Sequence, residues 1–264
     1  MASGAWRAAA WGWARRRYSV LLALALWEGI ARSGAVNPRL FPGLGAIADQ
    51  LWIMLRTQVA FRHAWATLFR VFVGFAVAGV LGVLLGFLMA RVRLFARLLE
   101  PAFSFGYPVP RVALYPVFIF LFGLGHLSKI VLIVLECVYP VAISTYYANR
   151  AVNPTFIWSA QNMGASRSRV FLRVIVPATA PGIFAGLRIA LPIALIIAVV
   201  CEMISATEGL GWLIAYASAS LSRSQVFAGV AIIAAIGFAL DRLLAAARNR
   251  IVFWEEERVS IGLS

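Results

Sequence analysis

A few charged residues lie within the long apolar runs of this chain, and these are the residues whose chemistry could matter for function. Glu136 lies in the middle of one run, Arg111 lies in a proline-rich run, and Glu202 ends a third. A charge at membrane depth is costly unless it is paired or faces water. We therefore expect Arg111 and Glu136 either to pair or to line an aqueous pathway separately. Glu202 is expected near the outer side, beside the segment GLGW at 209–212. A purely structural ion pair or a snorkelling side chain is the alternative for each charge.

No set of residues in the sequence predicts catalysis or a bound cofactor. The sequence has no carboxylate pair, no nucleophile motif and no cluster of Cys and His, and His63 and His126 stand outside any metal-ligand spacing. A phosphate-binding loop needs a lysine followed by Ser or Thr. The one lysine, Lys129, is followed by Ile130. We expect this chain to be no enzyme and to bind no metal or cofactor, so that any ATP would be hydrolysed on a partner subunit.

The polar connection at residues 150–177 has the pattern of a helical hairpin. Asn153 and Pro154 are typical of a helix N-cap followed by proline at the first helical position. Gly164 falls where a left-handed C-cap residue is needed, and Ser166 can cap a second helix. A long cationic connection between two apolar runs indicates a cytoplasmic structure on which a partner docks. A loop that only joins two spans is the alternative.

The elements that position these residues are predicted to be transmembrane helices. Of the 264 residues, 62% are hydrophobic and 13% are charged, whereas about 25% are charged in soluble domains. The apolar runs are continuous rather than alternating, which predicts an all-α integral membrane protein and not a β-barrel. A net charge of +14 could indicate nucleic acid in a soluble protein. Here the arginines sit mainly at the ends of apolar runs, so we expect membrane lipid, and no nucleic acid, as their partner.

Apolar runs of sufficient length predict about six spans within a single transmembrane domain at 1–264, with its core at about 62–250. The spans are expected at about 17–33, 66–90, 100–123, 127–149, 179–204 and 226–247. Four prolines interrupt the third, which should be kinked or partly unwound. Residues 34–65 predict an amphipathic helix that lies in the membrane interface or packs on the bundle. The distribution of arginine favours both chain ends on the inner side.

Residues 158–177 resemble the cytoplasmic coupling signature of binding-protein-dependent ABC importer permeases. That signature reads E-A-A, three residues, G, nine residues, I-x-L-P. The spacing is intact here, with matches at Ala160, Gly164 and Pro177. The departures from the signature are Trp158, Ser159, Val174 and Val176. The resemblance assigns contact with the ATPase to Trp158, Ala160, Gly164, Ala165 and Pro177, with Trp158 in the place of the usual glutamate.

Further segments are similar to one branch of that family, the nitrate, sulfonate, taurine and bicarbonate importers. They are LFPGLGAIADQL at 40–51, ATLFRVFVGF at 66–75, residues 108–125 and residues 201–214. The resemblance implies a type I ABC importer permease fold in a bacterial inner membrane. It also implies a second permease copy, two ATP-binding cassette ATPase subunits and a periplasmic solute-binding protein. The expected role is inward movement of a small polar or anionic solute by alternating access. An autonomous secondary transporter or channel is the alternative.

Overall fold

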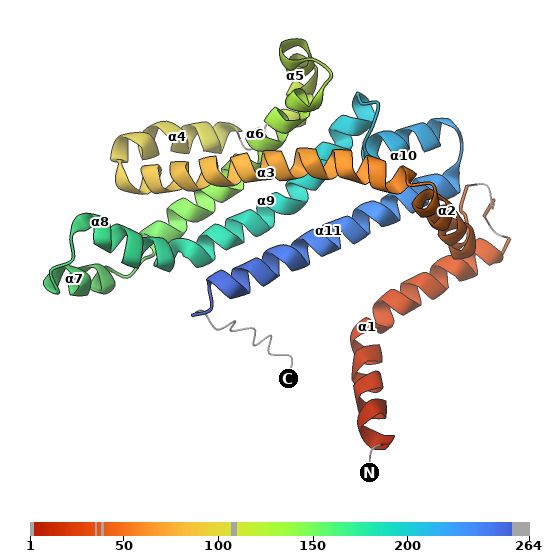
Figure 1. Ribbon diagram of the computed structural model, residues 1–264, viewed down its shortest axis with the longest axis horizontal. Helices are drawn as coiled ribbons and strands as arrows, with labels where there is room; N and C mark the ends of the chain where they lie inside the picture. Colours follow the sequence, from red (N-terminus) through yellow and green to blue (C-terminus); the bar gives the residue numbers. More distant parts are fainter. Residues whose placement is uncertain (1–2, 35, 38–39, 107–109, 255–264) are drawn as a thin grey trace. The chain divides into compact units, whose positions relative to one another are not determined.

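The computed structural model describes residues 3–34, 36–37, 40–106 and 110–254, and the side chains of these except 3–17 and 102–106. All regular structure in the described residues is helical, which confirms the all-α prediction (Figure 1). The chain forms two compact units, one from Met1–Phe61 with Ile214–Ile232 and one from Arg62–Leu213 with Ile233–Ser264. Helices α10 (Leu210–Ala219) and α11 (Arg223–Ile251) contribute residues to both.

The first unit is organised around Trp27 in α1 (Ser3–Arg32). The Trp27 indole stacks on Phe41 with 4.1 Å between ring centroids, and it donates a hydrogen bond from Nε1 to the Pro42 carbonyl at 3.1 Å. The Glu28 carboxylate accepts a hydrogen bond from the Leu44 backbone N–H at 2.7 Å. That bond satisfies an amide at the start of α2 (Leu44–Arg56), the helix expected within residues 34–65. Its placement at the membrane interface stays a prediction.

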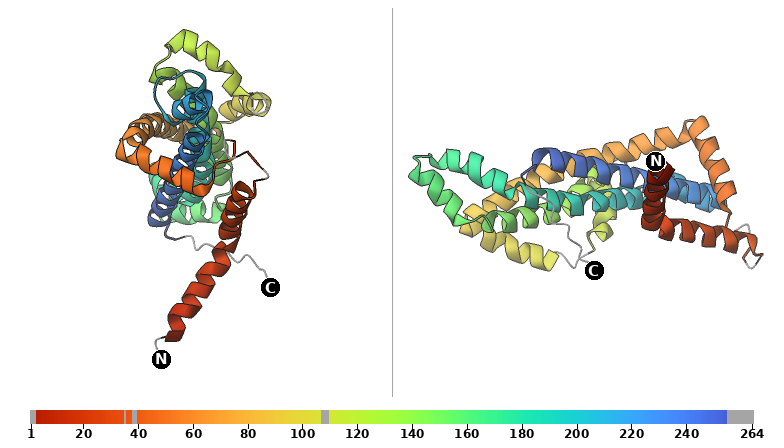
Figure 2. Two further views of the ribbon diagram at one scale, coloured as in Figure 1. Left: turned by 90° about the vertical axis from the view of Figure 1, so that its right-hand side faces the viewer. Right: turned by 90° about the horizontal axis from the view of Figure 1, so that it is seen from below.

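The second unit contains the remaining helices. They are α3 (Val59–Arg91, within this unit from Arg62), α4 (Arg93–Gly106), η1 (Arg111–Leu114), α5 (Tyr115–Phe122), α6 (His126–Arg150), α7 (Pro154–Asn162), α8 (Arg167–Val170), η2 (Phe171–Ile175) and α9 (Val176–Ile204). Helices α6 and α9 run side by side in every view (Figure 2). The core between α3, α6 and α9 is apolar, and its buried members include Val71, Ala78, Leu132, Cys137, Val141, Ala190, Ala194 and Ala198.

Four helical segments of the described residues are long and apolar enough to span a membrane: α3, α6, the continuous segment 167–204 and α11. They correspond to four of the six predicted spans. The predicted first span lies in α1, which ends at Arg32 as expected. Within the predicted third span, α4 ends at Gly106 and η1 begins at Arg111. Pro108, one of the four prolines in that span, lies outside the described residues.

Candidate functional site

The hairpin after α6 is built as its cap residues predict. The Asn153 side chain accepts a hydrogen bond from the Thr155 backbone N–H at 2.9 Å, and Pro154 is the first residue of α7. Gly164 has φ +78°, and its N–H donates to the Gln161 carbonyl at 2.9 Å. The Ala165 N–H donates to the Ala160 carbonyl at 3.0 Å. These two bonds form a Schellman motif, which ends α7 in a fixed geometry.

Three of the proposed coupling residues, Ala160, Gly164 and Ala165, therefore meet in one C-terminal cap. The Ala160 side chain is buried, whereas a β-carbon on Gly164 would have no heavy atom within 4 Å. Glycine at 164 is thus required by the left-handed backbone and not by lack of space. This geometry explains the spacing between these residues without any partner.

The second arm of the hairpin continues directly into a membrane helix. The Ser166 hydroxyl accepts a hydrogen bond from the Arg169 N–H, as predicted for a cap. Pro177 lies in the first turn of α9, which begins at Val176. The fifth span was expected to begin at about 179, but the helical segment extends back without a break to Arg167. Pro177 has no N–H and its ring conflicts with a carbonyl one turn earlier. A π-helical turn at Phe171–Ile175 lies just before the proline and widens the helix there, so the helix continues instead of ending.

Trp158 lies on α7 with 62% of its surface exposed. Phe156 and Met163 in the same hairpin are also exposed. The hairpin therefore presents an apolar surface in addition to its arginines. Within the second unit it occupies the end of α9 opposite to Glu202 (Figure 1).

Arg111 and Glu136 are brought together by η1 and α6. Arg111 Nη2 lies 3.1 Å from Glu136 Oε2, and the side chains are 17% and 13% exposed. The same guanidinium lies 5.9 Å from the centre of the Tyr139 ring. Glu136 is ten residues into α6, about 15 Å along the helix axis from its start. Of the two alternatives for these charges, this is the paired arrangement.

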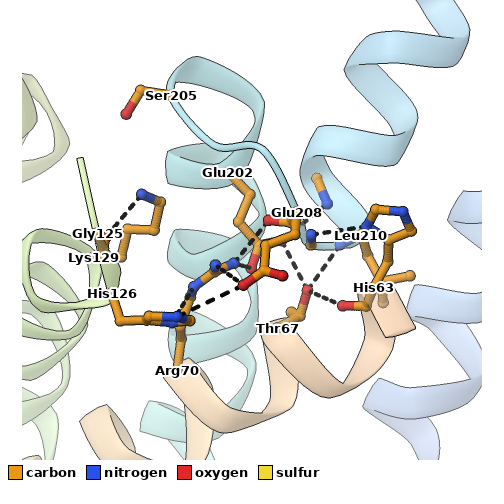
Figure 3. A network of polar contacts seen from close by, with 12 residues as sticks. His63, Thr67, Arg70, Gly125, His126, Lys129, Glu202, Ser205, Glu208 and Leu210 are labelled. Carbon is orange, nitrogen blue, oxygen red and sulfur yellow. Dashed lines mark hydrogen bonds and ion pairs between the residues drawn. The ribbon is translucent and has the colours of Figure 1, made fainter. Parts of the chain in front are cut away.

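Glu202 sits in a buried polar network that the sequence only partly indicated (Figure 3). Its carboxylate is fully buried and accepts hydrogen bonds from Thr67 Oγ1 at 2.8 Å and from the Gly211 N–H at 3.0 Å. The expected proximity to GLGW is therefore observed. A β-carbon on Gly209, where φ is +121°, would collide with this carboxylate. The glycine lets the loop close over Glu202.

Arg70 is the central cation of this network, and sequence reasoning missed it. Arg70 Nη1 lies 2.5 Å from Glu202 Oε1 and 3.0 Å from the Glu208 carbonyl oxygen. Its Nε donates to His126 Nδ1 at 3.1 Å. A signal was present, because His63, Thr67 and Arg70 follow each other at helical spacing on one face of α3.

The network also holds the start of α10 in place through hydrogen bonds to its backbone. Thr67 Oγ1 accepts a hydrogen bond from the Leu210 N–H at 2.9 Å, and His63 Nδ1 accepts one from the Gly209 N–H at 3.1 Å. Nearby, Lys129 Nζ donates to two carbonyls of the preceding turn, at Leu124 and Gly125. The buried charges thus join α3, the end of α9 and the first residues of α10 (Figure 3). This arrangement contains no nucleophile with a base, so it is suited to fixing structure and not to catalysis.

Comparisons with known proteins agree with this architecture. Residues 80–252 match the family model described as binding-protein-dependent transport system inner membrane component. The taurine transport system permease protein TauC of Escherichia coli is 32% identical over 258 residues, which cover 94% of each chain. A Bacillus subtilis permease named for aliphatic sulfonates transport, SsuC, is 28% identical over 92% of this chain and 88% of its own. A solved structure of the MetNI methionine ABC transporter in an inward-facing conformation aligns with a TM-score of 0.60 at 20% identity, over 77% of this chain and 96% of that one.

These matches decide between the two classes of transporter that the sequence left open. The hairpin at residues 150–177 falls inside the matched residues 80–252, and the fold is that of a type I ABC importer permease. Members of this family work with ATPase subunits and a solute-binding protein in the inner membrane and are not themselves enzymes. The chain therefore belongs to the binding-protein-dependent transport system inner membrane components, and it is the multi-pass permease subunit of an ABC importer.

Proposed function

We propose that two copies of this permease form the pathway of an importer for small sulfonates, and that each copy engages one ATPase subunit through α7. A periplasmic binding protein delivers the solute, and ATP is bound by the ATPase alone. Closure of the ATPase subunits draws the two 154–176 hairpins together. The spans then pass from an inward-open to an outward-open state, which is alternating access.

The observation that carries this proposal is the rigid joint between α7 and the helix that follows it. The Schellman bonds at Gly164 and Ala165 hold the end of α7, and the Ser166 cap follows immediately. From Arg167 the chain is one helix of 38 residues. Movement imposed on α7 can therefore reach the membrane span without a flexible linker to absorb it.

Trp158 supports an apolar contact with the ATPase. It stands where the family signature has glutamate, and its indole is largely exposed. Exposed tryptophans that fill a pocket on a partner are typical anchors of protein interfaces. We assign Trp158 to a notch on the ATPase surface, with Ala160, Gly164, Ala165 and Pro177 holding the hairpin that presents it.

The choice of a sulfonate rests on the relatives named for taurine and for aliphatic sulfonates. Arg111 is the residue on this chain that we assign to contact with the anion, because a guanidinium can bind a sulfonate through two parallel hydrogen bonds. Glu136 neutralises Arg111 when no solute is present. Glu202 belongs to the buried network at the end of α9, and we assign it to holding the loop rather than to the pathway.

Reconstitution tests this function. The permease, its ATPase and its binding protein are placed in vesicles, and uptake of radiolabelled taurine is measured with unlabelled alkanesulfonate, nitrate or bicarbonate as competitor. We expect ATP-dependent uptake that alkanesulfonate inhibits more strongly than nitrate or bicarbonate. Uptake by the permease alone would instead indicate an autonomous transporter. Co-purification of two differently tagged copies tests the homodimer.

A further inference from the structure

A pocket of about 370 Å³ lies where the end of α3 meets the start of the 167–204 helix. Its lining residues are Arg91, Arg167, Ser168, Phe171 and Leu172. All of its lining residues belong to the second unit, and four of them lie in the hairpin arm that leads into α9. It is separate from the buried network around Glu202, which lies at the other end of α9.

The lining of this pocket is cationic. Two arginines and a serine line it, and none of the lining residues is acidic. In the described part of the chain, neither Arg91 nor Arg167 takes part in an ion pair. The Arg91 guanidinium rests on the Phe171 ring, 4.3 Å from its centre, and Phe171 packs edge-on against Phe87. One of the two cations is therefore held in position before any anion arrives.

The lining also includes two apolar residues, Phe171 and Leu172, and its arginines stand at the ends of helical segments long and apolar enough to span a membrane. Arg91 is the last residue of α3, and Arg167 is the first residue of the 167–204 helix. Arginines at the ends of apolar spans lie at the level of the lipid headgroups. Phe171 and the exposed Leu172 follow Arg167 within the span segment. The pocket thus combines positive charge and apolar surface at the depth where a phospholipid combines phosphate and hydrocarbon.

We propose that this pocket binds the headgroup phosphate of an anionic phospholipid such as phosphatidylglycerol. The two guanidinium groups and Ser168 donate to the phosphate oxygens, and Phe171 and Leu172 contact the glycerol and first methylenes. Free phosphate or a carboxylate from the ATPase would pair with the arginines and Ser168 but would leave Phe171 and Leu172 without an apolar partner. Bound lipid would join the end of α3 to the base of the coupling hairpin. This inference goes beyond the transport role and does not depend on the solute.

The test is native mass spectrometry of the purified permease with phosphatidylglycerol, phosphatidylcholine or inorganic phosphate added. The pocket variant carries Arg91→Gln and Arg167→Gln. The matched control carries Arg169→Gln and Arg173→Gln, which remove the same amount of charge from the segment that holds Arg167 but do not line the pocket. We expect the pocket variant to bind phosphatidylglycerol about tenfold or more weakly, since each arginine near a lipid surface contributes about 1 kcal/mol. The control variant should retain phosphatidylglycerol.

Three results would overturn the proposal. If the pocket variant and the control lose the same amount of phosphatidylglycerol binding, the lipid is attracted by the overall positive charge and not by this pocket. Phosphatidylcholine held as tightly as phosphatidylglycerol would remove the preference for an anionic lipid. Displacement of the lipid by millimolar inorganic phosphate would identify a site for free anions. If the double variant does not fold, Arg167→Gln is compared with Arg169→Gln, because both side chains are exposed on the same short helix.

Discussion

Arg70 of α3 and Glu202 of α9 form a buried ion pair with 2.5 Å between Nη1 and Oε1. Their side chains are 3% and 0% exposed. The pair lies inside one compact unit, and 132 residues separate its members in the chain. Glu202 also accepts hydrogen bonds from Thr67 and from the Gly211 N–H, and because both members of the pair are buried, neither charge meets lipid. The pair fixes the end of α9 against α3.

Removing one member of this pair should destabilise the permease strongly. Arg70→Gln or Glu202→Gln leaves the other charge buried without its partner, which typically costs about 3–5 kcal/mol. The double variant should be less destabilised than the sum of the two. Thermal unfolding in detergent gives the coupling energy. The same cycle on Arg188 and Asp241, whose side chains are 61% and 42% exposed, serves as control and should give at most about 1 kcal/mol. Equal coupling in the two cycles would contradict this account.

Thr67 should control how firmly the start of α10 is held. Its hydroxyl donates to Glu202 and accepts from the Leu210 N–H, so Thr67→Val removes both bonds. An unsatisfied buried amide costs about 1–3 kcal/mol. We expect faster amide hydrogen exchange at residues 209–211 in Thr67→Val. Thr67→Ser keeps the hydroxyl and should exchange at the wild-type rate. Unchanged exchange in Thr67→Val would show that other contacts hold the loop.

Local rules made the hairpin predictable, and long-range packing made the network unpredictable. Asn153, Gly164 and Ser166 act through bonds to residues at most four positions away, so their types and spacing were sufficient. Glu202 was placed correctly beside GLGW because both lie in one short stretch of chain. Arg70 finds its partners only after α3, α6 and α9 have packed together. The π-helical turn before Pro177 was missed because a proline at the entry to a helix and a proline tolerated inside one have the same local sequence pattern.

Gly164 should be essential for coupling but not for insertion. Its φ of +78° costs a residue with a β-carbon about 1 kcal/mol or more, and β-branched residues suffer most. Gly164→Val is expected to reach the membrane but to transport less solute per ATP hydrolysed. Asparagine tolerates the left-handed conformation, so Gly164→Asn is the matched control and should remain largely coupled. A normal transport-to-ATP ratio in Gly164→Val would exclude the coupling role of this cap.

Trp158 should contribute directly to ATPase binding. Trp158→Ala removes an exposed indole from α7 and is expected to weaken binding by on the order of 1–3 kcal/mol. The affinity of the ATPase for permease in nanodiscs gives this value. Phe253→Ala removes an aromatic ring outside the hairpin that is even more exposed, at 79% against 62% for Trp158, and should leave the affinity unchanged. If Trp158→Ala also leaves it unchanged, Trp158 does not face the ATPase.

Arg111 forms an ion pair with Glu136 and is also proposed to contact the solute. Two experiments can separate these roles. Because the side chains are mostly buried and 3.1 Å apart, each single Gln variant should lose stability, and the double variant should lose less than the sum. A coupling energy near zero would show that the pair does not form in the membrane.

Measurements of solute uptake test the proposed contact between Arg111 and the anion. Glu136→Gln leaves Arg111 available to an anion, whereas Arg111→Gln removes the guanidinium. At matched amounts of folded protein, taurine uptake should therefore fall far more in Arg111→Gln than in Glu136→Gln, and equal losses would restrict the pair to a structural role.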